Sequence, residues 1–143
     1  SRRRHTRFRN VTGVQTCASS DLNIASDTLY MALYTAFADI NDNTTAYTTT
    51  NEVTGGGYTA GGQALSNVTI NSTSNGVVYV SFSNVVWSSV QFTTRGALIY
   101  NATRSNASIA VLDFGSDKTQ TGNNTFTVVL PPDTSSSALI QIN

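Results

Sequence analysis

The sequence predicts an all-β domain, an antiparallel β-sandwich or jelly-roll-like fold of about seven or eight strands with one long glycine-rich loop. Two observations predict this class. The apolar residues gather in short runs rich in Val, Ile, Leu, Phe and Tyr, and each run is bounded by Gly, Asn, Asp or Ser, as strands are bounded by turns. Runs with helical periodicity are nearly absent. With 143 residues, the chain fits one domain that can bury a core without disulfides or a metal.

The first strand is predicted within "DTLYMALYTAF", residues 27–37, where side chains on two faces alternate. One face carries Leu29, Met31 and Leu33, and the other carries Tyr30, Ala32 and Tyr34. A helix is the competing interpretation, since Met, Ala and Leu are good helix formers. A strand is favoured because the run is short and both tyrosines then lie on one face.

Residues 38–62, "ADINDNTTAYTTTNEVTGGGYTAGG", are predicted to form an extended surface loop with room for one helical turn. The segment is polar and rich in glycine. A loop of this length inside a compact domain is uncommon, and such loops are more often functional than not. We therefore expect residues 39–62 to contribute to the surface that the protein uses.

Two strands and a third apolar run follow this loop. Residues 63–82 predict a hairpin, because Asn75-Gly76 is a strong turn signal between apolar runs. The run at 84–92 contains Trp87, which we expect to anchor the core or an interface.

The remaining strands are predicted near the C-terminus. Residues 95–115 predict two strands around a polar turn at 101–108. Residues 124–132 and 137–143 predict two more, separated by a break at Pro131-Pro132.

Residues 1–22 are predicted to be an artefactual or disordered segment outside the domain, which we place at 23–143. Five arginines and one aspartate give the segment a net charge of +4, against −4 for the rest of the chain. A basic arm that binds nucleic acid is one interpretation, and a secretory signal fails because no apolar core follows the arginines. The pieces "SRRRHTRFRN", "VTGVQTC" and "SSDL" resemble translated sequencing-adapter read-through.

Once residues 1–22 are set aside, the domain contains no histidine and no cysteine. Zinc would find no nitrogen or sulfur ligand, and no ordinary base could activate a serine. Glu52 is the only glutamate, and Lys118, the only lysine, is expected in a solvated turn at 115–124. These observations predict a protein that is not an enzyme and holds no cofactor or metal. The net charge of −4 also argues against nucleic acid.

One loop motif leaves calcium open. Asp39, Asn41 and Asn43 occupy alternate positions, as at the start of a calcium loop. Thr44 and Thr50 stand where an EF-hand needs glycine and glutamate, so a solvated, turn-forming loop is favoured over a weak calcium site.

Five blocks of the domain carry a resemblance. These are "SDTLYMALYT", "TTAYTTTNEVTGGGYTAGGQAL", "FTTRGALIYN", "AVLDFGSDKT" and "ALIQIN". Over residues 24–143 the chain resembles a family of small proteins encoded by tailed bacteriophages. Members usually carry a further N-terminal helical segment, and the adapter-like residues stand in its place here. The resemblance implies a virion-associated structural protein and supplies no catalytic residues.

The expected function is a structural one in the virion, as a capsid decoration or a neck or tail accessory subunit. Its expected partners are other virion proteins, with homo-oligomerisation left open and no membrane contact, since no run is long and apolar enough for a membrane helix. The expected interaction surface includes Tyr47, Tyr58 and Trp87. One alternative is a host-surface or carbohydrate-binding module of a phage fibre, which would use Tyr47 and Tyr58. A secreted adhesin-like domain is a third interpretation.

Overall fold

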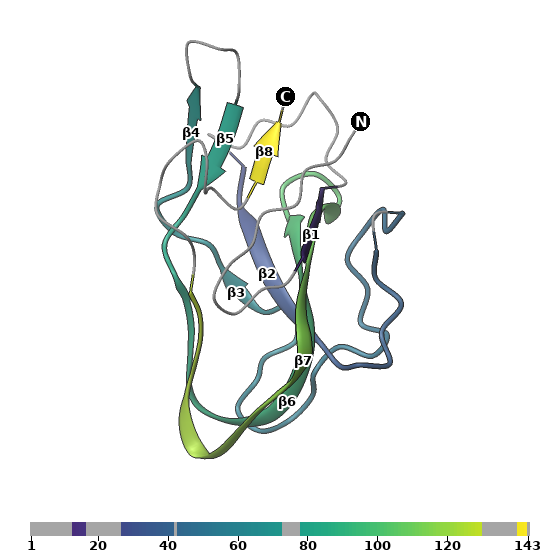
Figure 1. Ribbon diagram of the computed structural model, residues 1–143, viewed down its shortest axis with the longest axis vertical. Coiled ribbons are helices and arrows are strands. Elements are labelled where there is room, and N and C mark those ends of the chain that lie inside the picture. The colour runs from purple at the N-terminus through teal and green to yellow at the C-terminus, as the bar shows by residue number, and fades with distance from the viewer. Residues whose placement is uncertain (1–12, 17–26, 42, 73–77, 130–139, 143) are drawn as a thin grey trace.

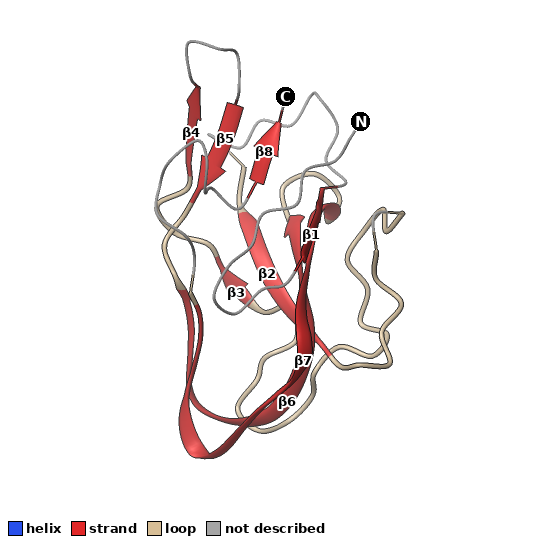
Figure 2. Ribbon diagram, in the orientation of Figure 1, coloured by secondary structure: helices blue, strands red, loops and turns tan. Residues whose placement is uncertain are grey.

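The computed structural model describes residues 13–16, 27–41, 43–72, 78–129 and 140–142. All regular secondary structure in these residues is β-strand, and the strands pair antiparallel (Figure 1 and Figure 2). The predicted all-β class is confirmed. The strands are β1 Gly13–Thr16, β2 Leu29–Tyr34, β3 Gln63–Ala64, β4 Thr69–Ser72, β5 Val78–Ser81, β6 Val85–Asn101, β7 Ala107–Val128 and β8 Ile140–Ile142.

These strands form two sheets. The main sheet has the order β1-β7-β6-β2-β3, and the smaller one has the order β4-β5-β8. The pairing of β4 with β5 agrees with the predicted hairpin, although its turn at Asn75-Gly76 lies outside the described residues, as does Pro131-Pro132. The sandwich or jelly-roll arrangement and the predicted number of strands stay predictions.

β2 has the alternation that its sequence predicts. Leu29, Met31 and Leu33 belong to one buried cluster, while Ala32 and Tyr34 belong to another on the opposite side of the strand. Both sides of β2 are therefore covered, and the competing helix is wrong for this run. The strand pairs with the end of β6 over its full length.

β6 and β7 form one long hairpin whose turn, residues 102–106, falls within the predicted polar turn. The lengths of the strands differ from the prediction. The runs predicted separately at 84–92 and 95–100 belong to one strand of 17 residues. β7 has 22 residues and continues through 115–124, so the turn predicted around Lys118 is wrong.

Irregular pairing explains why these strands continue. The register between β6 and β7 shifts at four points, including one between Thr94 and Gly96. A bulge of this kind inserts residues into one strand without ending the ladder. Gly115 and Gly122 have φ angles of 81° and 72°, which glycine adopts without a steric penalty. Both glycines therefore lie at irregular positions within β7, although in the sequence they are typical of a turn.

The hairpin curves strongly at its lower end, where β6 and β7 turn upward together (Figure 1). The first half of β6 contributes Val85, Trp87, Val90 and Phe92 to the cluster that contains the inner side chains of β2. Trp87 is only 2% exposed, so of the two roles expected for it, core or interface anchor, it has a core position in this chain. The curved hairpin thus supplies both a part of the sheet and much of the core that covers it.

The segment between β2 and β3 is more closely packed than predicted. The described residues 35–41 and 43–62 contain no helical turn. Three of the side chains expected at the surface, Glu52, Val53 and Tyr58, are buried. The reason is that the chain returns along β2, where the Val53 N–H donates to the Leu33 carbonyl at 2.9 Å. We call residues 35–62 the β2–β3 loop.

Residues 13–16 lie in the segment that was predicted to be outside the domain. They form β1 and pair with β7 from Gly13–Asp113 to Thr16–Ala110. The remainder of 1–26 lies outside the described residues. The boundary at residue 23 stays a prediction.

Candidate functional site

The β2–β3 loop converges on Glu52, the only glutamate of the chain, which is 5% exposed. Its Oε1 accepts a hydrogen bond from the Tyr47 hydroxyl at 2.7 Å. Its Oε2 accepts one from the Tyr58 hydroxyl at 2.6 Å and one from the Gly61 N–H at 2.8 Å. Three donors from one loop therefore meet at one carboxylate. These bonds compensate the desolvation that burial imposes on a charged group.

The same cluster is bonded to the main sheet. The Leu33 N–H in β2 donates to the Tyr58 hydroxyl at 2.9 Å, so this oxygen is both acceptor and donor. In β6, the Tyr100 hydroxyl donates to the Gly61 carbonyl at 2.8 Å. Glu52 itself forms an isolated antiparallel bridge with Tyr34 at the end of β2. The carboxylate thus holds the loop to the edge of the sheet.

The loop covers both sides of that edge. Val53 and Tyr58 pack in the cluster that contains Trp87, and the Tyr58 ring meets Phe92 edge-on at 5.9 Å. Tyr47 packs in the cluster on the other side of the sheet. Glu52 lies between these two apolar regions. The packing of the loop on both sides and the hydrogen bonds to Glu52 together fix the backbone path of this polar loop.

Burial raises the pKa of the tyrosines around this carboxylate. For Tyr47 and Tyr58, the hydrogen bond to Glu52 raises the pKa further, because it favours the protonated phenol. Burial also raises the pKa of Tyr34. Burial and the charge of Glu52 raise the pKa of Tyr100 to about 12. These hydroxyls therefore stay protonated, and able to donate, throughout the neutral range.

Three tyrosine rings stack on this side of the sheet. The Tyr100 ring lies 4.6 Å from that of Tyr47 and 5.8 Å from that of Tyr30, with interplanar angles of 20° and 23°. Tyr30 and Tyr47 are half-buried, so this stack reaches the surface. We call these three residues the tyrosine stack.

The three residues predicted as an interaction surface have different environments. Tyr47 is half-buried and belongs to the tyrosine stack. Tyr58 and Trp87 are buried in the main core and offer no accessible ring face in this chain. An interaction through these residues stays a prediction. The sequence analysis did not identify Glu52 as the centre of the cluster. The pattern that could have indicated it is a single glutamate between two tyrosines along the chain.

A second buried acid lies at the opposite end of the sheet. The Asp27 side chain is 3% exposed, and its Oδ2 accepts hydrogen bonds from Asn101 Nδ2 at 2.7 Å and Arg104 Nε at 2.6 Å. The Asn101 Oδ1 accepts the Thr103 N–H at 3.0 Å. These bonds fasten the β6–β7 turn beside the start of β2. They are stabilising contacts within the chain.

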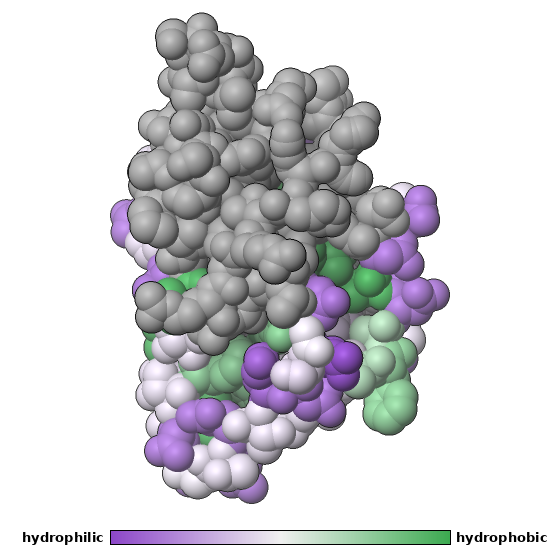
Figure 3. Space-filling view, in the orientation of Figure 1, coloured by the Kyte–Doolittle hydropathy of each residue, from purple (hydrophilic) through white to green (hydrophobic). Residues whose placement is uncertain are grey.

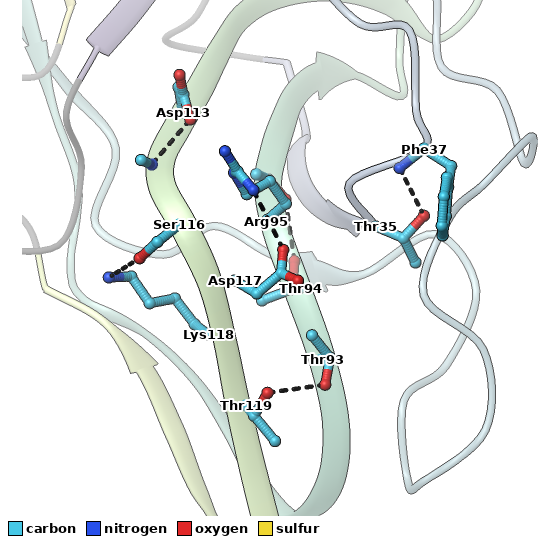
Figure 4. A network of polar contacts seen from close by, with 12 residues as sticks. Thr35, Phe37, Thr93, Thr94, Arg95, Asp113, Ser116, Asp117, Lys118 and Thr119 are labelled. Carbon is cyan, nitrogen blue, oxygen red and sulfur yellow. Dashed lines mark hydrogen bonds and ion pairs between the residues drawn. The ribbon is translucent and has the colours of Figure 1, made fainter.

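Polar side chains form a row along the β6–β7 hairpin (Figure 4). Arg95 and Asp117 form an ion pair at 3.5 Å between half-exposed side chains. Lys118 Nζ donates to the Ser116 Oγ at 3.1 Å. Lys118 therefore lies on a strand, beside the ion pair, and not in the solvated turn that was predicted for it.

Beside this row, β7 lines a cavity of about 320 Å³, which we call the β7 pocket. All of its lining residues belong to β7, and they include both apolar and polar side chains. The lining residues are Phe114, Asp117, Lys118, Thr119, Gln120, Phe126, Thr127 and Val128.

The calcium-like motif forms turn-type hydrogen bonds. Asn41 Nδ2 donates to Asp39 Oδ1 at 3.2 Å, and the Asn43 N–H donates to Asn41 Oδ1 at 2.8 Å. Within the ranges that the structure describes, no three His, Cys, Asp or Glu side chains group as a metal site would require. In those same ranges, no helix has the length and apolar character needed to cross a membrane.

The described part of one face is mostly hydrophilic or neutral, with separate hydrophobic patches (Figure 3). Two large apolar side chains among the described residues are exposed, Phe37 at 84% and Val86 at 44%. Phe37 lies in the β2–β3 loop, where Asn51 Nδ2 donates to its carbonyl at 2.9 Å. No protein-family model, curated protein or solved structure matches this chain.

Proposed function

We propose that the chain is a non-enzymatic structural subunit of a tailed-bacteriophage particle, acting through protein–protein contacts as a capsid decoration or a neck or tail accessory subunit. The observation that carries the proposal is the engagement of the Glu52 carboxylate. Both of its oxygens are occupied by donors of its own loop. A buried acid that is saturated in this way holds shape, whereas a general acid or base needs access to a substrate proton.

The composition of the chain supports the same class. The domain is rich in Ser, Thr and Asn, is sparsely charged, and contains no histidine or cysteine after residue 22. A rigid loop with an exposed aromatic side chain suits contact with other proteins. The sequence blocks described above resemble proteins of tailed phages. We include in this proposal the finer fold, a sandwich or jelly roll, which is common among capsid proteins.

The test is the protein composition of purified particles. The phage that encodes this chain is grown, its particles are purified, and the copy number of the chain is measured by quantitative mass spectrometry. We expect a fixed copy number relative to the major capsid protein. Absence of the chain from particles that contain all other structural proteins would contradict the proposal.

A second candidate is a carbohydrate-binding module of a phage fibre, and the tyrosine stack favours it. Aromatic side chains pack against sugar rings, and Tyr30 and Tyr47 are both partly exposed. Tyr58 was expected to take part, but its ring is buried in the core. A glycan array separates the two candidates, because selective binding that Tyr30→Ala removes would favour the fibre module.

A further inference from the structure

The Phe37 side chain is an exposed aromatic group on a fixed backbone. The residue is 84% exposed. Its N–H donates to Thr35 Oγ1 at 3.4 Å (Figure 4), and its carbonyl accepts a hydrogen bond from Asn51 at 2.9 Å. The Thr35 N–H in turn donates to the Asn51 carbonyl at 3.0 Å. Because the backbone at Phe37 is already held, binding would order only the side-chain torsions of this residue, which lowers the entropic cost of using it as an interface anchor.

The β7 pocket has the chemistry to receive such a ring. Phe114, Phe126 and Val128 supply its apolar lining. Its volume is about 320 Å³, and a cavity of roughly 150 Å³ already accommodates benzene. Phe126 is the partly exposed ring of this lining, and it allows an edge-to-face contact, which adds to the gain from burial alone.

The charges beside the two features are complementary. Asp39 lies two residues after Phe37, and the Asp39 contact with Asn41 is to a neutral amide. Lys118 lines the pocket, and its contact with Ser116 is to a neutral hydroxyl. The acid that also lines the pocket, Asp117, is paired with Arg95. An approaching Asp39 would therefore meet an ammonium group and an acid whose charge is already compensated.

Phe37 and Lys118 lie on opposite sides of the view in Figure 4, with the β6–β7 ribbon between them. One molecule therefore does not fill its own pocket with its own Phe37. We propose that Phe37 of one copy of this chain inserts into the β7 pocket of a second copy, with Asp39 facing Lys118. Because Phe37 and Lys118 lie on opposite sides of the hairpin (Figure 4), one neighbouring copy does not engage both at once. The contact is therefore head-to-tail, and repetition of such a contact gives a ring or a filament.

The first test measures self-association of the purified chain by sedimentation velocity, from about 1 μM to about 1 mM. The sedimentation coefficient of the native chain is expected to rise with concentration. Phe37→Ser and Lys118→Glu should each raise the dissociation constant at least about tenfold. Val86→Ser, which removes the other exposed apolar side chain, is the matched control and should leave association unchanged. A monomer at every concentration, or an equal effect of Val86→Ser, would overturn the proposal.

The second test distinguishes a head-to-tail contact from a symmetric one. Phe37→Ser keeps an intact pocket, and Lys118→Glu keeps an intact Phe37. Each variant alone should be monomeric, and their mixture should form a one-to-one dimer that grows no further. A mixture that remains monomeric would overturn the proposal. Circular dichroism confirms that both variants are folded.

The charge contact has its own test. Asp39→Lys alone should weaken association, and Asp39→Lys combined with Lys118→Asp should restore it. Failure of the double variant to restore association would exclude the pairing of Asp39 with Lys118. This self-association does not depend on the virion proposal. Its failure would leave that proposal standing, because these measurements use the isolated chain.

Discussion

The core around Trp87 and the β2–β3 loop are held by different forces. In the core, Trp87 and Phe92 from the first half of β6 pack with side chains of β2 in one apolar cluster. The loop is fixed through the carboxylate of Glu52 and the hydroxyls of Tyr47 and Tyr58. The stability of the core depends on how well its apolar volume is filled. The stability of the loop depends on each buried donor having an acceptor, because an unmet buried donor destabilises the fold.

The largest expected effect is on the core around Trp87. Trp87→Ala should lower the free energy of unfolding by about 3–5 kcal/mol, since it removes the largest fully buried side chain and leaves a cavity. Urea denaturation measures this loss.

Trp87→Phe is the matched control. Among the residues that the structure describes, the Trp87 Nε1 has no hydrogen-bond partner, so this substitution removes volume but no hydrogen bond. It should therefore cost much less than Trp87→Ala. Equal losses for the two variants would show that packing volume is not what Trp87 supplies.

The next effect is on the β2–β3 loop. Glu52→Gln keeps the size of the side chain but turns an amide N–H₂ toward one of the donors. It should lower the free energy of unfolding by about 1–3 kcal/mol, the cost of an unsatisfied buried donor. Limited proteolysis should show faster cleavage within the β2–β3 loop, while the main core remains protected.

Tyr47→Phe is the control for Glu52→Gln. It removes one donor and leaves the carboxylate with two. Its loss should be smaller than that of Glu52→Gln. Full stability of Glu52→Gln would contradict the assignment of the carboxylate as the centre that fixes the loop.

Alkaline pH should weaken the attachment of the β2–β3 loop, to which Tyr100 donates a hydrogen bond. The pKa of Tyr100 is raised from 10.0 to about 12 in the folded chain, so above pH 10 the unfolded chain binds fewer protons than the folded one. Stability from this group is complete below pH 10 and is lost as the pH rises toward 12. Urea denaturation at increasing pH measures the loss, and Tyr100→Phe should make it less steep. An identical slope in this variant would exclude the contribution of Tyr100.

The smallest effect should come from the exposed ion pair, and a second ion pair gives the comparison. Arg95→Ala should cost no more than about 1 kcal/mol, because Arg95 and Asp117 are both about half exposed and screened by water. Arg104→Ala should cost more, since it takes a charged donor from the Asp27 carboxylate, which is 3% exposed. Thermal unfolding of the two variants in the same buffer makes the comparison. A larger loss for Arg95→Ala would reverse the order that burial predicts.

Local patterns in the sequence predicted a part of this fold. The alternation of β2 and the polar turn after Asn101 follow from side-chain period and turn chemistry. The same local signals failed for β7. The segment that contains Gly115 and Gly122 has the composition of a turn. It stays within a strand because β7 pairs with β6 through register shifts.

The candidate site was predictable only in pieces. The long loop and Tyr47 were identified from the sequence, while the burial of Tyr58 and the role of Tyr100 were not. Tyr100 lies 39 residues after Gly61, to which it donates a hydrogen bond. Contacts between residues so distant along the chain produce no local periodicity, so a pattern in a single sequence does not predict them.

The sequence by itself determined that this chain forms antiparallel strands, because alternation and turn residues act between near neighbours. It also determined which ionisable side chains are present, including a single glutamate in the whole chain. Only the tertiary structure decided that this glutamate is buried and saturated and that Phe37 is exposed. The physical reason is that burial is a property of the assembled sheet and loop, set by which distant segments pack together.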